Sequence, residues 1–227
     1  MTASMKSKQL ELLLHEFELM SKTALIQLQI AKKLLQDNTI QSLYDEAEAN
    51  EIIMDRMEIK IREEVVFTIF QFTPKAADLR KIITYQDITT NLERVGDMLL
   101  NIIHFIRETD LSKPEFIEIK KMITKMMEYV SEMLHNAIIA FSNGDSHVAY
   151  QIIKEDDKVD EIFRQIGISL QDSFENKQLS KTEVQNIINI NAISHNLERI
   201  GDSATNIAEA IIYQTEGKDI RHGNYKQ

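Results

Sequence analysis

A seven-residue segment occurs twice in this 227-residue chain, so an internal duplication is the strongest constraint on its fold. The first copy, Asn-Leu-Glu-Arg-Val-Gly-Asp, begins at Asn91, and the second, Asn-Leu-Glu-Arg-Ile-Gly-Asp, begins at Asn196. Eight of the twelve residues from Asn91 to Ile102 are identical to those 105 positions further on. Self-similarity at a fixed offset predicts two copies of one structural unit. Because each copy has the usual size of a small domain, we expect domains over residues 1–110 and 111–227.

The composition favours helices and excludes several classes of function. The chain has two prolines, six glycines and no cysteine, and it is rich in the helix formers Leu, Met, Glu and Lys. Without cysteine there is neither a disulfide nor a thiolate site. No apolar run approaches the roughly 18 residues of a membrane span, which predicts a soluble, cytoplasmic protein. The net charge of −10, with no basic cluster, argues against nucleic-acid binding.

Apolar residues recur at three- and four-residue steps in six long stretches, and this periodicity predicts six helices. Turn or capping residues separate these stretches, at Asp37-Asn38, Thr73-Pro74, Leu111 to Pro114, Asn143-Gly144, and Ser180 with Glu183. Three helices per half, joined by short turns, predict an all-α fold of two tandem, pseudo-symmetric antiparallel three-helix bundles.

Some helix ends and one core face can also be predicted. Ser112 is a candidate N-cap for the fourth helix, and Asp145 or Ser146 for the fifth. The sixth helix should end near Gly217, leaving residues 222–227 as a frayed tail. On the third helix, apolar residues at helical spacing predict a core-facing stripe formed by Leu79, Ile82, Ile88, Leu92, Val95, Leu99, Ile102 and Ile106.

Each copy of the repeated segment places two carboxylates four residues apart. These pairs are Glu93 with Asp97 and Glu198 with Asp202. The same offset of 105 relates a second set of acidic pairs on the preceding helix of each half, Glu51 with Asp55 and Asp156 with Asp160. Because consecutive helices of a bundle run antiparallel, we expect the two pairs of each half to meet across one groove.

The charge of these pairs suits them to cation binding. Like charges at i and i+4 destabilise a helix by a few tenths of a kcal/mol, and a bound cation reverses that penalty. Carboxylate oxygens favour hard ions such as magnesium, manganese, calcium or ferric iron. Asn101 and Asn206, one turn further on, are candidate outer ligands or orienting residues. Gly96 and Gly201 lie within the helices and indicate either a close approach of a neighbouring helix or bulky neighbours over that turn.

The competing interpretation of the acidic pairs is a solvated helix face, since short motifs of this kind often match by chance. Four pairs in register count against it, although copies inherited from one ancestor are not four independent observations. Arg94 and Arg199 are expected to pair with nearby acids or with the opposing helix rather than to bind a ligand. The six histidines are scattered, and we expect surface or core roles for them.

Three segments of the chain resemble the PhoU family of phosphate-signalling proteins. Residues 196–208, Asn-Leu-Glu-Arg-Ile-Gly-Asp-x-x-x-Asn-Ile-Ala, resemble the signature of that family. Residues 74–80 are similar to its Pro-x-Ala-x-Asp-Leu-Arg stretch, and residues 217–222 are similar to its usual ending. The resemblance spans nearly the whole chain, but the Asp-Leu-Arg stretch is not repeated in the second half.

The resemblance implies two three-helix bundles with multinuclear sites for iron, zinc, manganese or magnesium at repeated (Glu or Asp)-x-x-x-Asp motifs. Carried onto this chain, the ligands are Glu51, Asp55, Glu93, Asp97, Asp156, Asp160, Glu198 and Asp202. The resemblance also implies a cytoplasmic homodimer without enzymatic activity, a negative regulator that links a phosphate ABC transporter ATPase to a sensor histidine kinase. Association with the membrane is then expected only through these partners.

Two other classes of protein remain open on the sequence. A carboxylate-bridged metalloenzyme normally supplies Glu-x-x-His pairs in its helices, whereas Gly96 and Gly201 stand at the position of that histidine. A cytoplasmic domain of a sodium-phosphate cotransporter is the other class, since such appendages are similar to PhoU domains.

Overall fold

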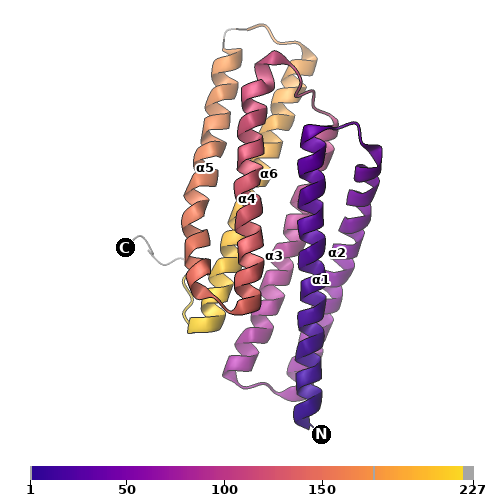
Figure 1. Ribbon diagram of the computed structural model, residues 1–227, viewed down its shortest axis with the longest axis vertical. Coiled ribbons are helices and arrows are strands. Elements are labelled where there is room, and N and C mark those ends of the chain that lie inside the picture. Colours follow the sequence, from indigo (N-terminus) through magenta and orange to yellow (C-terminus); the bar gives the residue numbers. More distant parts are fainter. Residues whose placement is uncertain (1, 176, 222–227) are drawn as a thin grey trace.

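The computed structural model describes residues 2–175 and 177–221, and over this part of the chain it is helical with no strand. The prediction of an all-α fold is confirmed. Six α-helices and one short 3-10 helix follow one another along the chain (Figure 1): α1 Thr2–Gln36, α2 Gln41–Phe72, α3 Ala76–Arg107, η1 Pro114–Phe116, α4 Ile117–Asn143, α5 Ser146–Phe174 and α6 Lys181–Glu216.

The helices form two antiparallel three-helix bundles, α1–α3 and α4–α6, as the duplication predicts. The third helices of the two bundles, α3 and α6, pack against each other along the centre of the molecule. The second helices, α2 and α5, lie at opposite lateral edges (Figure 1). The repeated segment therefore lies at the junction of the bundles, while its acidic counterparts lie on the outer helices. Within the described residues, no helix is long and apolar enough to cross a membrane.

Local chemistry accounts for most of the helix ends. The Asp145 side chain caps α5 by accepting a hydrogen bond from the backbone N–H of Val148. Ser180 and Glu183 form the predicted capping box at the start of α6. That helix ends at Gly217, which adopts a positive φ of 70° that favours glycine.

One predicted cap is wrong, and one prediction lies outside the described residues. The Ser112 hydroxyl donates its hydrogen bond to Asp110 Oδ1 at 2.6 Å, in the linker, and does not cap α4. A 3-10 turn that begins at Pro114 leads into α4 instead. Residues 222–227, for which a frayed tail is predicted, are not among the described residues.

The core of the first bundle continues into the second through an aromatic cluster. The rings of Phe17 in α1, Tyr85 in α3 and Phe141 in α4 pack edge to face, with centroids 4.6 to 5.8 Å apart. Burial raises the pKa of the Tyr85 phenol to about 12. Such contacts stabilise a core beyond simple burial of area, so the two bundles share one apolar interior.

The predicted core stripe on α3 is correct except at its first residue. Leu79 is 36% exposed, whereas the other seven residues of the stripe are buried. The reason is geometric. Leu79 precedes Asp97 by 18 residues, which is five helical turns, so it lies on the same side as that carboxylate and not on the core side.

Candidate metal sites

A glycine on α3 allows a carboxylate of α2 to lie close to the α3 backbone. A Cβ atom placed on Gly96 would lie 3.0 Å from Glu51 Oε2 and 2.9 Å from Met54 Sδ. Real Cβ contacts are not that short, so any larger residue at this position would displace the carboxylate or the thioether. Bulky side chains therefore lie over this turn, which is one of the two predicted reasons for the glycine, and Glu51 lies over the turn that carries Glu93 and Asp97.

Glu51 is the buried member of the four acids on the facing sides of α2 and α3, a cluster that we call the first groove. It is only 8% exposed, and neither carboxylate oxygen has a hydrogen-bond partner among the described residues. Burial raises the pKa of Glu51 to about 8, and the nearby carboxylates of Asp97, Asp55 and Glu93 add to the effect. A buried acid without hydrogen bonds is stable only if a proton or a cation neutralises it.

All four acids predicted for the first groove are therefore close enough to influence one another. Burial raises the pKa of Glu93, and Asp97, Glu58 and Asp55 raise it further, while Arg94 opposes them. The pairs on α2 and α3 meet across one groove, as the antiparallel arrangement predicts.

Glu58 is an additional acid of the first groove that the pattern of pairs did not identify. Glu58 is 8% exposed, and its carboxylate pairs with Arg62 one turn away. Its negative charge raises the pKa of Glu93. Its spacing of three residues from Asp55 places it on the same side of α2, so the sequence could have identified it. The repeat concealed it, because the residue 105 positions further on is Phe163.

The second groove repeats this construction between α5 and α6. A Cβ atom on Gly201 would lie 3.2 Å from Asp156 Oδ1, so here too a carboxylate lies over a glycine. Burial raises the pKa of Asp156 to about 7, and the negative charges of Asp160, Asp202 and Glu198 contribute to this rise. The groove therefore assembles the four acids that the duplication predicts, with Asp156 as its inner carboxylate.

Cationic residues also lie near the acids of the second groove. Burial raises the pKa of both Glu198 and Asp202. The nearby His195 and Arg199 lower both pKa values. Arg94, which belongs to α3 of the first bundle, also lowers the pKa of Asp202. Arg94 and Arg199 lie near these acids, but neither forms the expected ion pair with another described residue. His195, three residues before Glu198, lies on the same side of α6 as these acids.

The two asparagines predicted to lie near the carboxylates are on the protein surface. Asn101 and Asn206 are both exposed. Asn206 lines a cavity of about 240 Å³ between α3 and α6, together with Asn91, Arg94 and Arg221. Their role as outer ligands stays a prediction.

The fit of these grooves to a metal ion depends on the chemistry of the donors. As the side chains stand, no three Asp, Glu or His residues of the described chain form a group that could hold a metal ion. The buried Glu51 carboxylate nevertheless has both oxygens without partners, and the surrounding donors are oxygens that suit hard cations. The donor chemistry therefore suits a hard cation, and metal binding at these residues stays a prediction.

The fold and the grooves define a class of protein. Its members are all-helical, built from two tandem three-helix bundles, with one acidic groove between the second and third helix of each bundle. The two grooves are related by the same offset that relates the repeated segments.

This chain belongs to the PhoU family. The sequence profile described as "PhoU domain" matches it twice, at residues 17–106 and 123–211. The chain is 32% identical to the phosphate-specific transport system accessory protein PhoU homolog of Clostridium acetobutylicum over 169 residues, which cover 74% of this chain and 75% of that protein. It is 29% identical to PhoU of Escherichia coli K12 over 189 residues, which cover 82% and 74% of the two chains.

Solved structures show the same architecture. The crystal structure of PhoU from Pseudomonas aeruginosa matches with a TM-score of 0.83 and 26% identity, covering 93% of this chain and 99% of the other. The phosphate transport system regulatory protein PhoU from Streptococcus pneumoniae matches with a TM-score of 0.83 at 19% identity, covering 94% and 98%, and this match supports the fold alone. The prediction of two tandem three-helix bundles is confirmed.

Proposed function

We propose that this protein is a metal-binding regulatory adaptor of phosphate transport, and not an enzyme. Its relatives are named as accessory proteins of the phosphate-specific transport system. In the proposed role, it links the ATPase of a phosphate ABC transporter to a sensor histidine kinase and restrains the phosphate response. It acts in the cytoplasm as a homodimer and reaches the membrane through these partners. Two equivalent acidic grooves, one per bundle, are the observation that carries the proposal.

The grooves supply the metal-dependent part of this function. Glu51, Asp55, Glu93 and Asp97 would hold a cation in the first groove, and Asp156, Asp160, Glu198 and Asp202 in the second. A bound iron, zinc, manganese or magnesium ion contributes positive charge at an otherwise acidic surface. The chain's own residues position that charge: the glycines beneath Glu51 and Asp156 let these carboxylates sit deep, while the exposed Asp97 and Asp202 remain at the groove mouth.

Elemental analysis of protein purified without chelator tests the metal sites. We expect bound metal in the unmodified protein and its loss in an Asp97→Asn, Asp202→Asn double variant. Asp156→Asn is compared with Asp157→Asn, because these neighbours differ in that only Asp156 lies over Gly201. Equal metal content in the unmodified protein and all variants would contradict metal binding by these carboxylates.

The adaptor role has a separate test. A tagged protein is recovered from phosphate-replete and phosphate-starved cells, and the co-purifying proteins are identified. We expect the transporter ATPase and the histidine kinase, with recovery that depends on phosphate. Recovery of neither protein in either state would contradict the adaptor role, and recovery of a sodium-phosphate cotransporter would assign the chain to that system instead. Turnover of a phosphate ester by metal-loaded protein would show an enzyme.

A further inference from the structure

The outer face of α2 carries a stripe of exposed apolar side chains that the bundle does not use. Ile52, Ile59, Val66 and Phe70 are 52%, 55%, 64% and 83% exposed. Their spacings of seven, seven and four residues place them on one side of the helix. At about 1.5 Å per residue, the stripe is about 27 Å long. Large apolar side chains that repeat along one exposed side of a helix indicate an interaction surface.

The duplication provides an internal control for this stripe. The residues that stand 105 positions further on lie on α5 or at its end, at the opposite edge of the molecule, and all four are exposed and polar: Asp157, Arg164, Gln171 and Glu175. The two helices have the same place in equivalent bundles, so folding of the bundle does not require apolar residues there. The stripe therefore belongs to something that the first bundle does and the second does not.

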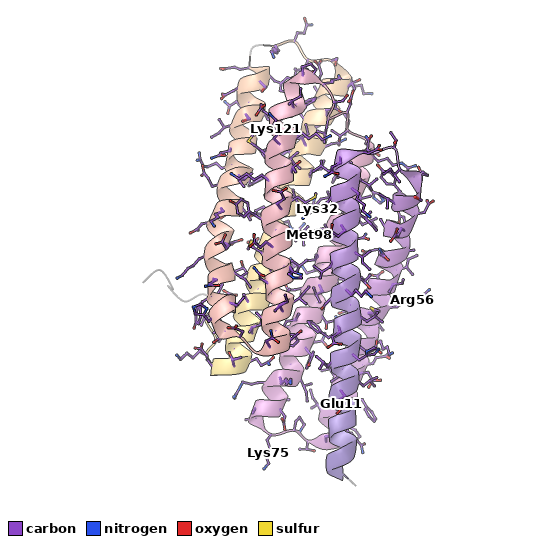
Figure 2. All side chains as sticks on the ribbon, in the orientation of Figure 1. Glu11, Lys32, Arg56, Lys75, Met98 and Lys121 are labelled. Atoms are coloured by element: carbon purple, nitrogen blue, oxygen red, sulfur yellow. The ribbon has the colours of Figure 1, made fainter. Side chains whose placement is uncertain are left out.

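Two charged residues complete the α2 stripe. Arg56 and Glu63 lie between the apolar positions, so that the residues follow each other at steps of four, three, four, three and four, which is the spacing of a coiled-coil seam. Both side chains are exposed, and neither forms a hydrogen bond or ion pair with another described residue. Figure 2 shows Arg56 pointing away from the bundle at the edge of the molecule.

The arrangement of charge identifies the partner. Arg56 lies on one side of Ile59 and Glu63 on the other. A second copy of the helix that runs in the opposite direction therefore places unlike charges opposite each other. If two α2 helices pack antiparallel about a two-fold axis near Ile59, Arg56 of each copy meets Glu63 of the other. Ile52 then lies near Val66 of the other copy, and the two Ile59 side chains lie side by side. Phe70, at the end of the stripe, lies opposite Ala49 of the other copy. An isologous interface requires this self-complementarity.

We propose that the stripe Ile52, Arg56, Ile59, Glu63, Val66 and Phe70 on α2 is the surface through which two copies of this chain associate. The proposal deepens the homodimer of the proposed function, on which it rests, by assigning its interface. It also places the first groove of each copy beside the interface, because the α2 acids of that groove lie on the adjoining side of the same helix, and the second groove far from it.

Charge reversal tests the contact directly. In a dimer of Arg56→Glu, two carboxylates would face each other at each contact, and in a dimer of Glu63→Arg, two guanidinium groups would do so. Each variant alone should therefore be monomeric, with dimer affinity reduced about a hundredfold. An equimolar mixture of the two variants pairs unlike charges in the mixed dimer and should restore association. Light scattering after size exclusion separates the monomer of 26.3 kDa from a dimer of twice that mass.

A second pair of variants tests the apolar part of the stripe. Ile59→Asp should be monomeric, whereas Arg164→Asp at the equivalent position of α5 should remain dimeric. Unchanged helical circular dichroism confirms that each variant is folded. A wild-type protein that is monomeric at its highest soluble concentration would overturn both the homodimer and this interface. A dimer that Ile59→Asp leaves intact would overturn the interface alone, and neither result bears on recovery of the transporter or kinase.

Discussion

Replacing Glu51 with glutamine should make the metal-free protein more stable at alkaline pH, because it removes a buried carboxylate without partners. The pKa of this group is raised from an ordinary value of 4.5 to about 8. Between these values the folded protein holds the proton more tightly than the unfolded chain. Its stabilising effect is therefore complete below pH 4.5 and is lost as the pH rises to about 8.

The size of this effect follows from the shift. At 1.36 kcal/mol per pKa unit, a change from 4.5 to about 8 corresponds to at most about 5 kcal/mol of unfolding free energy. The groove is partly open to water, and screening reduces the expected difference to about 1–3 kcal/mol. The introduced glutamine side chain resembles the protonated acid in size and charge, so the variant and the wild type should be similar at pH 5.

Urea unfolding followed by circular dichroism, in the presence of a chelator, measures the difference at pH 5 and pH 8.5. We expect Glu51→Gln to exceed the wild type by about 1–3 kcal/mol only at pH 8.5. Glu46→Gln is the matched control, because Glu46 is exposed on the same helix and lies outside both the acidic groove and the apolar stripe. It should follow the wild type at both pH values. If Glu51→Gln loses stability with pH as steeply as the wild type does, the buried carboxylate is not the cause.

Three further substitutions test the packing and the helix ends through the same unfolding assay. Gly96→Ala should be about 1–3 kcal/mol less stable than Gly167→Ala, because the new methyl group collides with fully buried Met54 whereas nothing lies within 4 Å of Gly167; equal stability would show that the helices can separate without cost. Ser180→Ala should cost about 1 kcal/mol through loss of the capping box, and a neutral result would mean that the cap contributes little. Phe141→Ala should cost about 3–5 kcal/mol because its ring joins both bundles, and a loss below about 1 kcal/mol would show that the bundles are independent.

The helices, their ends and the pairing of the acidic residues could be predicted, because they depend on neighbouring residues or on periodic spacing. Helix ends at Ser180 and Gly217 depend on neighbouring residues, and the six helices depend on apolar spacing. The offset of 105 related Glu51 to Asp156 without any knowledge of their depth in the grooves. Burial was not predictable in this way, because it depends on how closely a second helix approaches.

The sequence by itself determined the helices, their grouping into two equivalent bundles, and the eight repeated carboxylates. Only the tertiary structure showed that Glu51 is the buried acid, that Glu58 joins the first groove, and that Arg94 acts on an acid of the other bundle. It also showed that Leu79 and the stripe on α2 face outward. The physical reason is that periodicity identifies the side of a helix on which a residue lies, whereas the packing of the helices decides what that side meets.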